Sequence, residues 1–299
     1  GQEMAERRKA SDFPKEVLAL FDGYIHGFID RRSFLEGTAK VVGGGTAAVA
    51  VLDALQPQYA WAAQVPEADE RIRAEYVEYA SPNGSGTMRG YMAEPEGATG
   101  PKPAVLVIHE NRGLNPYIED VVRRFAAADF VALGPDALTP LGGYPGNDDD
   151  GRTMQRQMDR DVMMEDWVAA FEFLRTHSTS TGRVGAVGFC YGGGVVNQLA
   201  VRLPNLGAGT PFYGSAPASE SVAQIQAPLL IHYAGLDERI NGRWPGYQEA
   251  LDASGKAYTM HMYEGVNHGF HNDTTPRFDE DAATLAQERT IAFFDQHLR

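Results

Sequence analysis

The chain has 299 residues, 43% hydrophobic and 22% charged, so it is long enough to bury a sizeable core. This near-average composition excludes a disordered chain, a collagen-like repeat and a coiled coil. The net charge of −14 disfavours a nucleic-acid partner, and without a run of about 18 apolar residues we expect no membrane insertion.

The N-terminal part, residues 1–66, has two competing interpretations. The first is a helical arm that begins after Asp12-Phe13-Pro14 and packs on the main domain or on a second subunit, which allows a homo-oligomer. Its apolar residues recur at helical spacing. They are Phe13, Val17, Leu18, Phe21, Ile25 and Phe28.

The second interpretation is an export signal. Arg31-Arg32, a mildly apolar stretch and Ala60-Trp61-Ala62 resemble a twin-arginine signal with its cleavage site. Asp30, Glu36 and Asp53 depart from that pattern, and thirty residues precede the arginines. We therefore favour the arm and a cytoplasmic location, with export to the periplasm through residues 30–62 as the alternative.

The remaining residues, 67–299, form one predicted α/β domain. Segments 73–80 and 87–93 flank a turn and predict an antiparallel hairpin. Further strands are expected at 104–109, 130–133, 184–189, 207–212, 229–234 and 258–263. Helices are expected near 118–128, 159–176, 192–202, 244–254 and 279–298. This alternation predicts a mainly parallel sheet with helices on both faces, which binds ligands at the carboxyl ends of its strands.

The single cysteine, Cys190, lies between a predicted strand and a predicted helix, in Gly188-Phe189-Cys190-Tyr191-Gly192-Gly193-Gly194. This is the nucleophile-elbow pattern with Cys in place of Ser. Glycines are needed there because a Cβ would collide, and the start of the helix favours a thiolate. The backbone N–H of Tyr191 is then placed to stabilise an oxyanion. The alternative is a structural cysteine in a tight turn, since the glycine spacing does not fit a dinucleotide-binding loop.

A base and an acid follow in the chain order of hydrolases with this fold, namely nucleophile, acid and base. Asp237 comes just after the predicted strand 229–234, and His268 comes after the last predicted strand. Cys190, Asp237 and His268 therefore form a candidate catalytic triad. Glu238 competes with Asp237 for the role of the acid, and an ordinary loop role remains open for each residue.

A fourth group of polar residues, 109–112, follows the predicted strand 104–109. The backbone N–H of Asn111 is the candidate second oxyanion donor. Glu110 is placed to accept a hydrogen bond from the thiol, or else to form a salt bridge with Arg112. The pair His109-Glu110 supplies too few ligands for zinc, so we expect no metal and no cofactor.

These stretches, with Asn267-His268-Gly269-Phe270, resemble the dienelactone hydrolase family (carboxymethylenebutenolidases) over roughly residues 70–299. The resemblance implies an α/β-hydrolase fold whose Cys–His–Asp triad opens a lactone through an acyl-cysteine. It implies that Glu110 holds the thiol in check until the substrate arrives. We therefore expect a hydrolase of small esters or lactones. The alternatives are a thiol peptidase or acyltransferase on the same fold, or a thiol-based redox or binding protein.

The resemblance also implies arginines that bind the carboxylate of the substrate. The first expected position, in 135–140, has no arginine, whereas Arg277 suits the second, and Arg112 and Arg152 are the candidate substitutes. The segment 141–151 carries three consecutive aspartates and is expected to be a solvated lid or rim loop. Tyr144, within it, is a further candidate for substrate binding.

Overall fold

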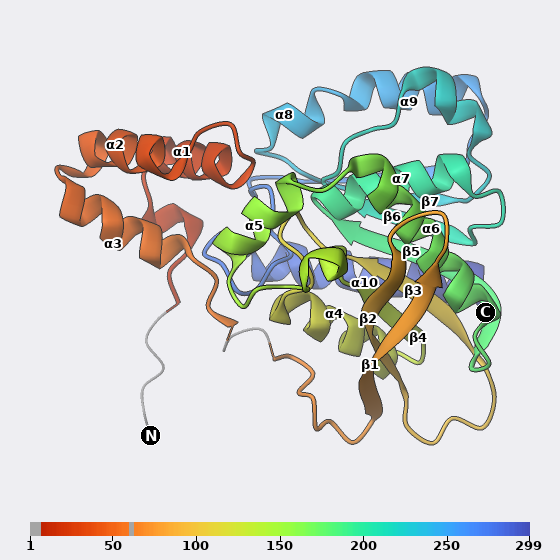
Figure 1. Ribbon diagram of the computed structural model, residues 1–299. Helices are drawn as coiled ribbons and strands as arrows, with labels where there is room; N and C mark the ends of the chain where they lie inside the picture. The colour runs from red at the N-terminus through yellow and green to blue at the C-terminus, as the bar shows by residue number, and fades with distance from the viewer. Residues whose placement is uncertain (1–6, 60–62) are drawn as a thin grey trace.

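The structure is a computed structural model that describes residues 7–59 and 63–299. The described residues form one sheet of eight strands, in the order β1-β2-β4-β3-β5-β6-β7-β8 (Figure 1). The strands are β1 (Ile72–Ser81), β2 (Gly86–Pro95), β3 (Lys102–Ile108), β4 (Val131–Pro135), β5 (Ser180–Phe189), β6 (Ala208–Phe212), β7 (Leu229–Ala234) and β8 (Tyr258–Tyr263). The pairs β1–β2 and β2–β4 are antiparallel and the others are parallel, which confirms the predicted hairpin and the mainly parallel sheet.

Helices cover both faces of the sheet, and each face has its own apolar core. On one face lie α6 (Arg160–Thr176), α7 (Tyr191–Arg202) and α9 (Trp244–Ala253). On the other lie α4 (Pro116–Ala127) and α10 (Glu280–Leu298). The central strands are therefore buried on both sides, which explains their continuous apolar runs. The carboxyl ends of β3, β5, β7 and β8 meet at one edge, where the polar motifs lie.

The N-terminal segment forms three helices, α1 (Lys15–Ile25), α2 (Arg31–Val42) and α3 (Gly45–Leu55), preceded by a short turn, η1 (Ala10–Asp12). They stand beside the sheet, next to α5 (Asp148–Arg156) (Figure 1). Most of the apolar residues expected to repeat here pack into a separate small core around Phe21 and Phe34. The expectation for Phe28 is wrong, because its side chain is 64% exposed at the end of the segment that follows α1.

The features that suggested export take local structural roles where the structure describes them. Arg31 begins α2, and Asp30 caps that helix by accepting a hydrogen bond from the N–H of Ser33. Ala60-Trp61-Ala62 lies outside the described residues. Within the described ranges, no single helix has the length and apolar character needed to cross a membrane. Only α2 and α3 together reach that threshold, and they are bent by 112°.

The acidic segment 141–151 differs from the expectation. It contains a short turn, η3 (Thr139–Leu141), and the start of the helix α5 (Asp148–Arg156), which Asn147 caps. Asp148 is 3% exposed, so the expected solvated loop is buried at this residue, whereas most of residues 141–147 are exposed. The physical reason is a buried cation, since the Asp148 carboxylate lies 2.9 Å from Nε of Arg112.

Candidate active site

Cys190 occupies a strained turn between β5 and α7. Its φ of 58° and ψ of −116° are rare for a residue with a side chain. A Cβ on Gly188 would lie 2.1 Å from the carbonyl oxygen of Gly192, and a Cβ on Gly192 would lie 2.2 Å from that of Ile108. The glycines are therefore required, as the nucleophile-elbow pattern predicts. The turn presents Sγ at a cavity, with the amino end of α7 beneath it.

His268 and Asp237 lie next to each other, on the loops that follow β8 and β7. Nδ1 of His268 is 2.5 Å from Oδ2 of Asp237, and both side chains are buried. The imidazole of His268 also brings a ring nitrogen within 4.8 Å of Cys190 Sγ. Glu238, the competing acid, is exposed. Of the two acids, Asp237 is thus the one that orients the imidazole.

The charges around the thiol favour an ion pair. Burial alone would raise the pKa of Cys190, but the adjacent charge of His268 and the hydrogen bond with His26 lower that pKa well below its ordinary value. Burial alone would lower the pKa of His268, but the Cys190 thiolate and Asp237 raise it to about 10. Both shifts favour a thiolate on Cys190 next to an imidazolium on His268.

The arm supplies a second imidazole that the sequence analysis did not identify. Nε2 of His26, just after α1, lies 3.7 Å from Cys190 Sγ, although 164 positions separate the two residues. Nδ1 of His26 is 2.7 Å from the backbone carbonyl of Asp22 and 3.3 Å from its carboxylate. The spacing of Asp22 and His26, four positions apart near the end of a predicted helix, was the available signal.

Within residues 7–59 and 63–299, His26, Cys190 and His268 also form a group with the ligand types of a metal site. Their ligand atoms all lie within 4.8 Å of one another. Two imidazoles and a thiolate are ligand types of zinc, and both rings are oriented by an acceptor on Nδ1. His109, by contrast, is held by its backbone surroundings, because its Nε2 accepts a hydrogen bond from the N–H of Ala137.

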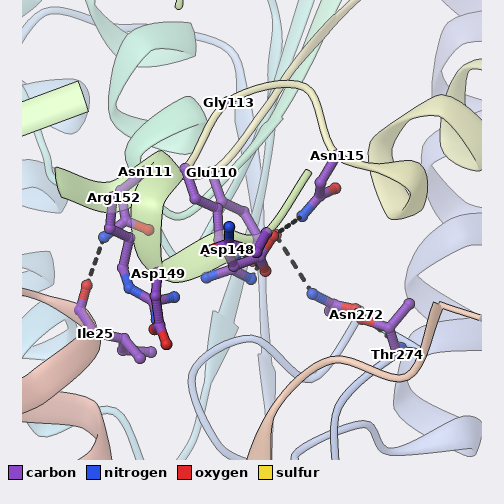
Figure 2. A network of polar contacts seen from close by, with 12 residues as sticks. Ile25, Glu110, Asn111, Gly113, Asn115, Asp148, Asp149, Arg152, Asn272 and Thr274 are labelled. Atoms are coloured by element: carbon purple, nitrogen blue, oxygen red, sulfur yellow. Dashed lines mark hydrogen bonds and ion pairs between the residues drawn. The ribbon is translucent and has the colours of Figure 1, made fainter. Parts of the chain in front are cut away.

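Glu110 belongs to a buried polar network beside the thiol (Figure 2). Its Oε1 lies 2.8 Å from Nη2 of Arg112 and accepts a long hydrogen bond of 3.4 Å from Asn272. Burial raises the pKa of Glu110, and the Arg112 charge opposes that rise. The Glu110 carboxylate is therefore paired with Arg112. The thiol of Cys190 instead has Nε2 of His26 within 3.7 Å. This differs from the expectation that Glu110 holds Cys190 in check.

The two expected oxyanion donors flank the thiol. Tyr191 is the first residue of α7, so its N–H has no acceptor within the helix. Asn111 lines the same cavity as Cys190, and its side chain donates a hydrogen bond of 2.7 Å to the carbonyl of Ile25 (Figure 2). The position of both residues suits the predicted role, which the backbone N–H groups would fill.

A cavity of about 700 Å³ opens at Cys190, between the arm, α5, α6 and α7. The three residues expected to bind substrate do not line it. Arg112 is paired with Glu110 and Asp148, Tyr144 donates to Asp148, and Arg277 is buried against Phe21 of the arm. These positions correct the expectation, and the reason is that Asp148 and the arm occupy the space around those side chains.

Other arginines line the cavity instead, and the sequence analysis missed them. They are Arg156, Arg160 and Arg239, and all are exposed. None of the three has a carboxylate partner within the described part of the chain. A protein with a net charge of −14 therefore presents unpaired positive charge at the mouth of this cavity.

Comparison with known proteins decides the family. The sequence profile of the dienelactone hydrolase family matches residues 88–298. The chain belongs to this family. It is therefore a hydrolase of the carboxylic ester class with the α/β-hydrolase fold. A separate profile, described as YqhI-like, matches residues 4–43 and so includes α1 and α2.

Individual relatives support the assignment. The chain is 58% identical over 112 residues to a hydrolase fragment named YghX from Escherichia coli K12, which covers 38% of this chain and 96% of that protein. It is 30% identical over 244 residues to a protein of Saccharolobus solfataricus named as a carboxymethylenebutenolidase, covering 69% and 93% of the two chains. A crystal structure titled as a dienelactone hydrolase from Klebsiella pneumoniae has a TM-score of 0.67 at 24% identity, covering 75% and 99%, and shows the shared fold.

Proposed function

We propose that this family member hydrolyses small carboxylic esters or lactones through a Cys190–His268–Asp237 triad and an acyl-cysteine intermediate. The observation that carries the proposal is the geometry at Cys190. A residue in the strained elbow conformation faces an imidazole whose other nitrogen is 2.5 Å from a buried carboxylate. This is the arrangement that nucleophilic acyl transfer requires.

In the first half of the reaction, the Cys190 thiolate attacks the carbonyl carbon of the substrate. The N–H groups of Tyr191 and Asn111 stabilise the oxyanion. The C–O bond then breaks, and Nε2 of His268 gives its proton to the leaving alkoxide. In a lactone, this alkoxide stays attached to the acyl group. Asp237 keeps the ring oriented and stabilises its positive charge before the transfer.

In the second half, Nε2 of His268 takes a proton from water as the water oxygen attacks the thioester carbonyl. The C–S bond then breaks, which restores the thiolate and the protonated imidazole and releases the acid. The volume of about 700 Å³ suits a small molecule. The unpaired Arg156, Arg160 and Arg239 support a substrate that carries a carboxylate. Arg112, Tyr144 and Arg277 act from outside the cavity lining, through their contacts with Glu110, Asp148 and the arm.

The test compares hydrolysis of p-nitrophenyl acetate and of a dienelactone by the wild type, Cys190→Ser and Cys190→Ala. We expect both variants to lose about 10³-fold or more in kcat/KM. Iodoacetamide provides an independent check, because Cys190 is the single cysteine of the sequence and one label per chain should abolish turnover. Cys190→Ala with wild-type turnover would refute the proposal. Analysis of the products with peptide substrates or added acyl acceptors distinguishes hydrolysis from peptidase or transferase activity.

A further inference from the structure

Phe28, in the segment after α1, lines the cavity at Cys190 although it belongs to the arm. Its side chain is 64% exposed and lies outside the small apolar core of the arm. An uncovered aromatic ring on the wall of a cavity gains free energy when an apolar group of a ligand removes it from water. Phe28 takes no part in the triad, so the triad does not explain its position.

Two contacts hold the Phe28 ring in place. The imidazole of His26 lies nearly parallel to it, at an interplanar angle of 23° and with the ring centroids 6.0 Å apart. The guanidinium of Arg239 lies 5.4 Å from the centroid of the Phe28 ring, which is a cation–π contact. Arg239 belongs to the short helix α8 (Glu238–Asn241), which begins directly after Asp237. The ring is therefore held between the arm and the helix that follows the triad acid.

The same rings lead from the reacting atoms to Phe28. His268, which protonates the leaving alkoxide in the route proposed above, meets His26 edge to face, with the ring centroids 4.9 Å apart. His26 in turn stacks on Phe28. The alcohol oxygen must lie at Nε2 of His268 during that proton transfer. The group attached to this oxygen is therefore the part of the substrate that lies nearest to His26 and, beyond it, to Phe28.

The rest of the cavity suits an aromatic group as well. Met158, Met163 and Met164 line it, at the start of α6 and just before it. Flexible thioether side chains adapt to the shape of a ligand and pack favourably against aromatic rings. The volume of about 700 Å³ is large enough for a ring on the alcohol in addition to the acyl group.

We propose that Phe28 determines the specificity for the alcohol part of the substrate, because it binds an aryl group there and so makes the enzyme select aryl esters over alkyl esters. This inference rests on the acyl-cysteine route and on the role of His268 proposed above. It gives the arm a part in substrate recognition, since His26 and Phe28 are the arm residues among those that line the cavity.

The contact with Phe28 acts in the first half of the reaction. The aryl alcohol leaves when the C–O bond breaks, so the acyl-cysteine is the same whichever alcohol the ester carried. Phe28 therefore affects kcat/KM, which reports the steps from free enzyme and ester to the acyl-enzyme, and leaves the hydrolysis of the acyl-enzyme unchanged.

The test compares phenyl acetate with trifluoroethyl acetate, which share the acetyl group and have activated alcohols with and without a ring. Each variant is compared with the wild type on each ester, so the intrinsic reactivity of the ester cancels. We expect Phe28→Ala to lower kcat/KM for phenyl acetate by about tenfold and to leave kcat/KM for trifluoroethyl acetate within about twofold. Phe28→Tyr keeps the ring and should retain the wild-type preference.

The matched control is Val49→Ala, which changes an exposed apolar residue on α3 of the same arm, outside the cavity lining. This variant should hydrolyse both esters as the wild type does. Phe28 is exposed, so its substitution should leave the fold intact, which thermal unfolding checks. An equal loss on both esters would show that Phe28 merely supports the arm, and an unchanged kcat/KM for phenyl acetate would show that the ring is not contacted. Either result refutes the inference.

A binding measurement keeps this inference separate from the proposed function. Ligand-observed NMR gives the Kd of phenol, the alcohol product, for Cys190→Ala and for the double variant that also carries Phe28→Ala. We expect the second substitution to raise this Kd by about tenfold, and equal Kd values would refute the inference. Binding requires no turnover, so a failure of the triad, seen as full turnover in Cys190→Ala, leaves this comparison valid.

Discussion

The carboxylate of Glu110 lies 2.8 Å from the guanidinium of Arg112, and both side chains are buried. The same guanidinium lies 2.9 Å from Asp148. One cation therefore neutralises two buried acids from separate segments, the turn after β3 and the start of α5. This pairing holds the turn after β3 in place and connects it to α5, the helix against which the arm packs.

Removal of this cation should be costly. Arg112→Met leaves Glu110 and Asp148 buried without a counter-charge, so we expect the free energy of unfolding to fall by about 3–5 kcal/mol in urea titrations. The matched control is Arg73→Met, which breaks an exposed pair with Glu94 and should cost less than about 1 kcal/mol. Equal losses in the two variants would contradict the structural role of the network.

Two Gly→Ala substitutions, one in the elbow and one in α9, should have opposite effects. Gly188→Ala should prevent the turn at Cys190 from forming and abolish activity, because its Cβ would meet the Gly192 carbonyl at 2.1 Å. Gly246→Ala, in α9, meets nothing within 4 Å and should stabilise the protein by about 1 kcal/mol. Thermal unfolding and ester hydrolysis measure both effects. An active Gly188→Ala enzyme would show that the strained turn is dispensable.

The pH dependence of acylation should reflect the thiolate–imidazolium pair. The adjacent His268 charge lowers the pKa of Cys190, so the thiolate form of the nucleophile is favoured at lower pH than in a free cysteine. The pKa of His268 is raised to about 10, so the general acid keeps its proton until the pH approaches 10 and loses it above. The rate of acylation can be measured as the initial burst of nitrophenol released from p-nitrophenyl acetate. We expect this burst rate to be constant from neutral pH to about 9 and to fall at higher pH.

The variant Asp237→Asn tests the cause of that alkaline limit. Without the Asp237 carboxylate, the pKa of His268 should fall, and the decline of the burst rate should begin at lower pH. Stability follows the same sign, since a raised histidine pKa contributes stability that is present below about 6.5 and lost as the pH rises toward 10. An alkaline limit that does not move would remove Asp237 from the triad.

Zinc should inhibit the enzyme reversibly. His26, Cys190 and His268 offer three ligand atoms within 4.8 Å, so we expect one Zn²⁺ per chain to block the nitrophenol burst and EDTA to restore it. His26→Ala removes one ligand, and inhibition of its burst should need at least about tenfold more zinc. Equal sensitivity of the two proteins would show that zinc binds elsewhere.

The arginines at the cavity mouth should favour anionic esters. Arg239→Gln should raise KM for an ester whose acyl part carries a carboxylate and leave KM for its uncharged analogue nearly unchanged. The difference should shrink as salt is added, because exposed charges are screened. The control is Arg183→Gln, remote from the cavity. An equal rise in KM for both esters would mean that Arg239 affects the shape of the cavity but does not select substrates by their charge.

The sheet, the elbow and the order of Cys190, Asp237 and His268 could all be predicted from the sequence. These features depend on local chemistry: apolar runs specify buried strands, glycines permit one strained turn, and parallel strands bring their carboxyl ends together. The burial of Asp148 and the pairing of Glu110 with Arg112 depended on a counter-charge from another segment, so the charge pattern of 141–151 alone predicted solvent exposure.

Only the tertiary structure brought His26 to Cys190 across 164 positions of sequence. The apolar spacing of the arm predicted a helix with one buried face, but the same spacing suits docking on any apolar surface or on a second subunit. Which surface it covers is decided by contacts between distant segments, such as the hydrogen bond from Asn111 to Ile25. Periodicity specifies which face of a helix is buried, whereas packing specifies the surface that buries it.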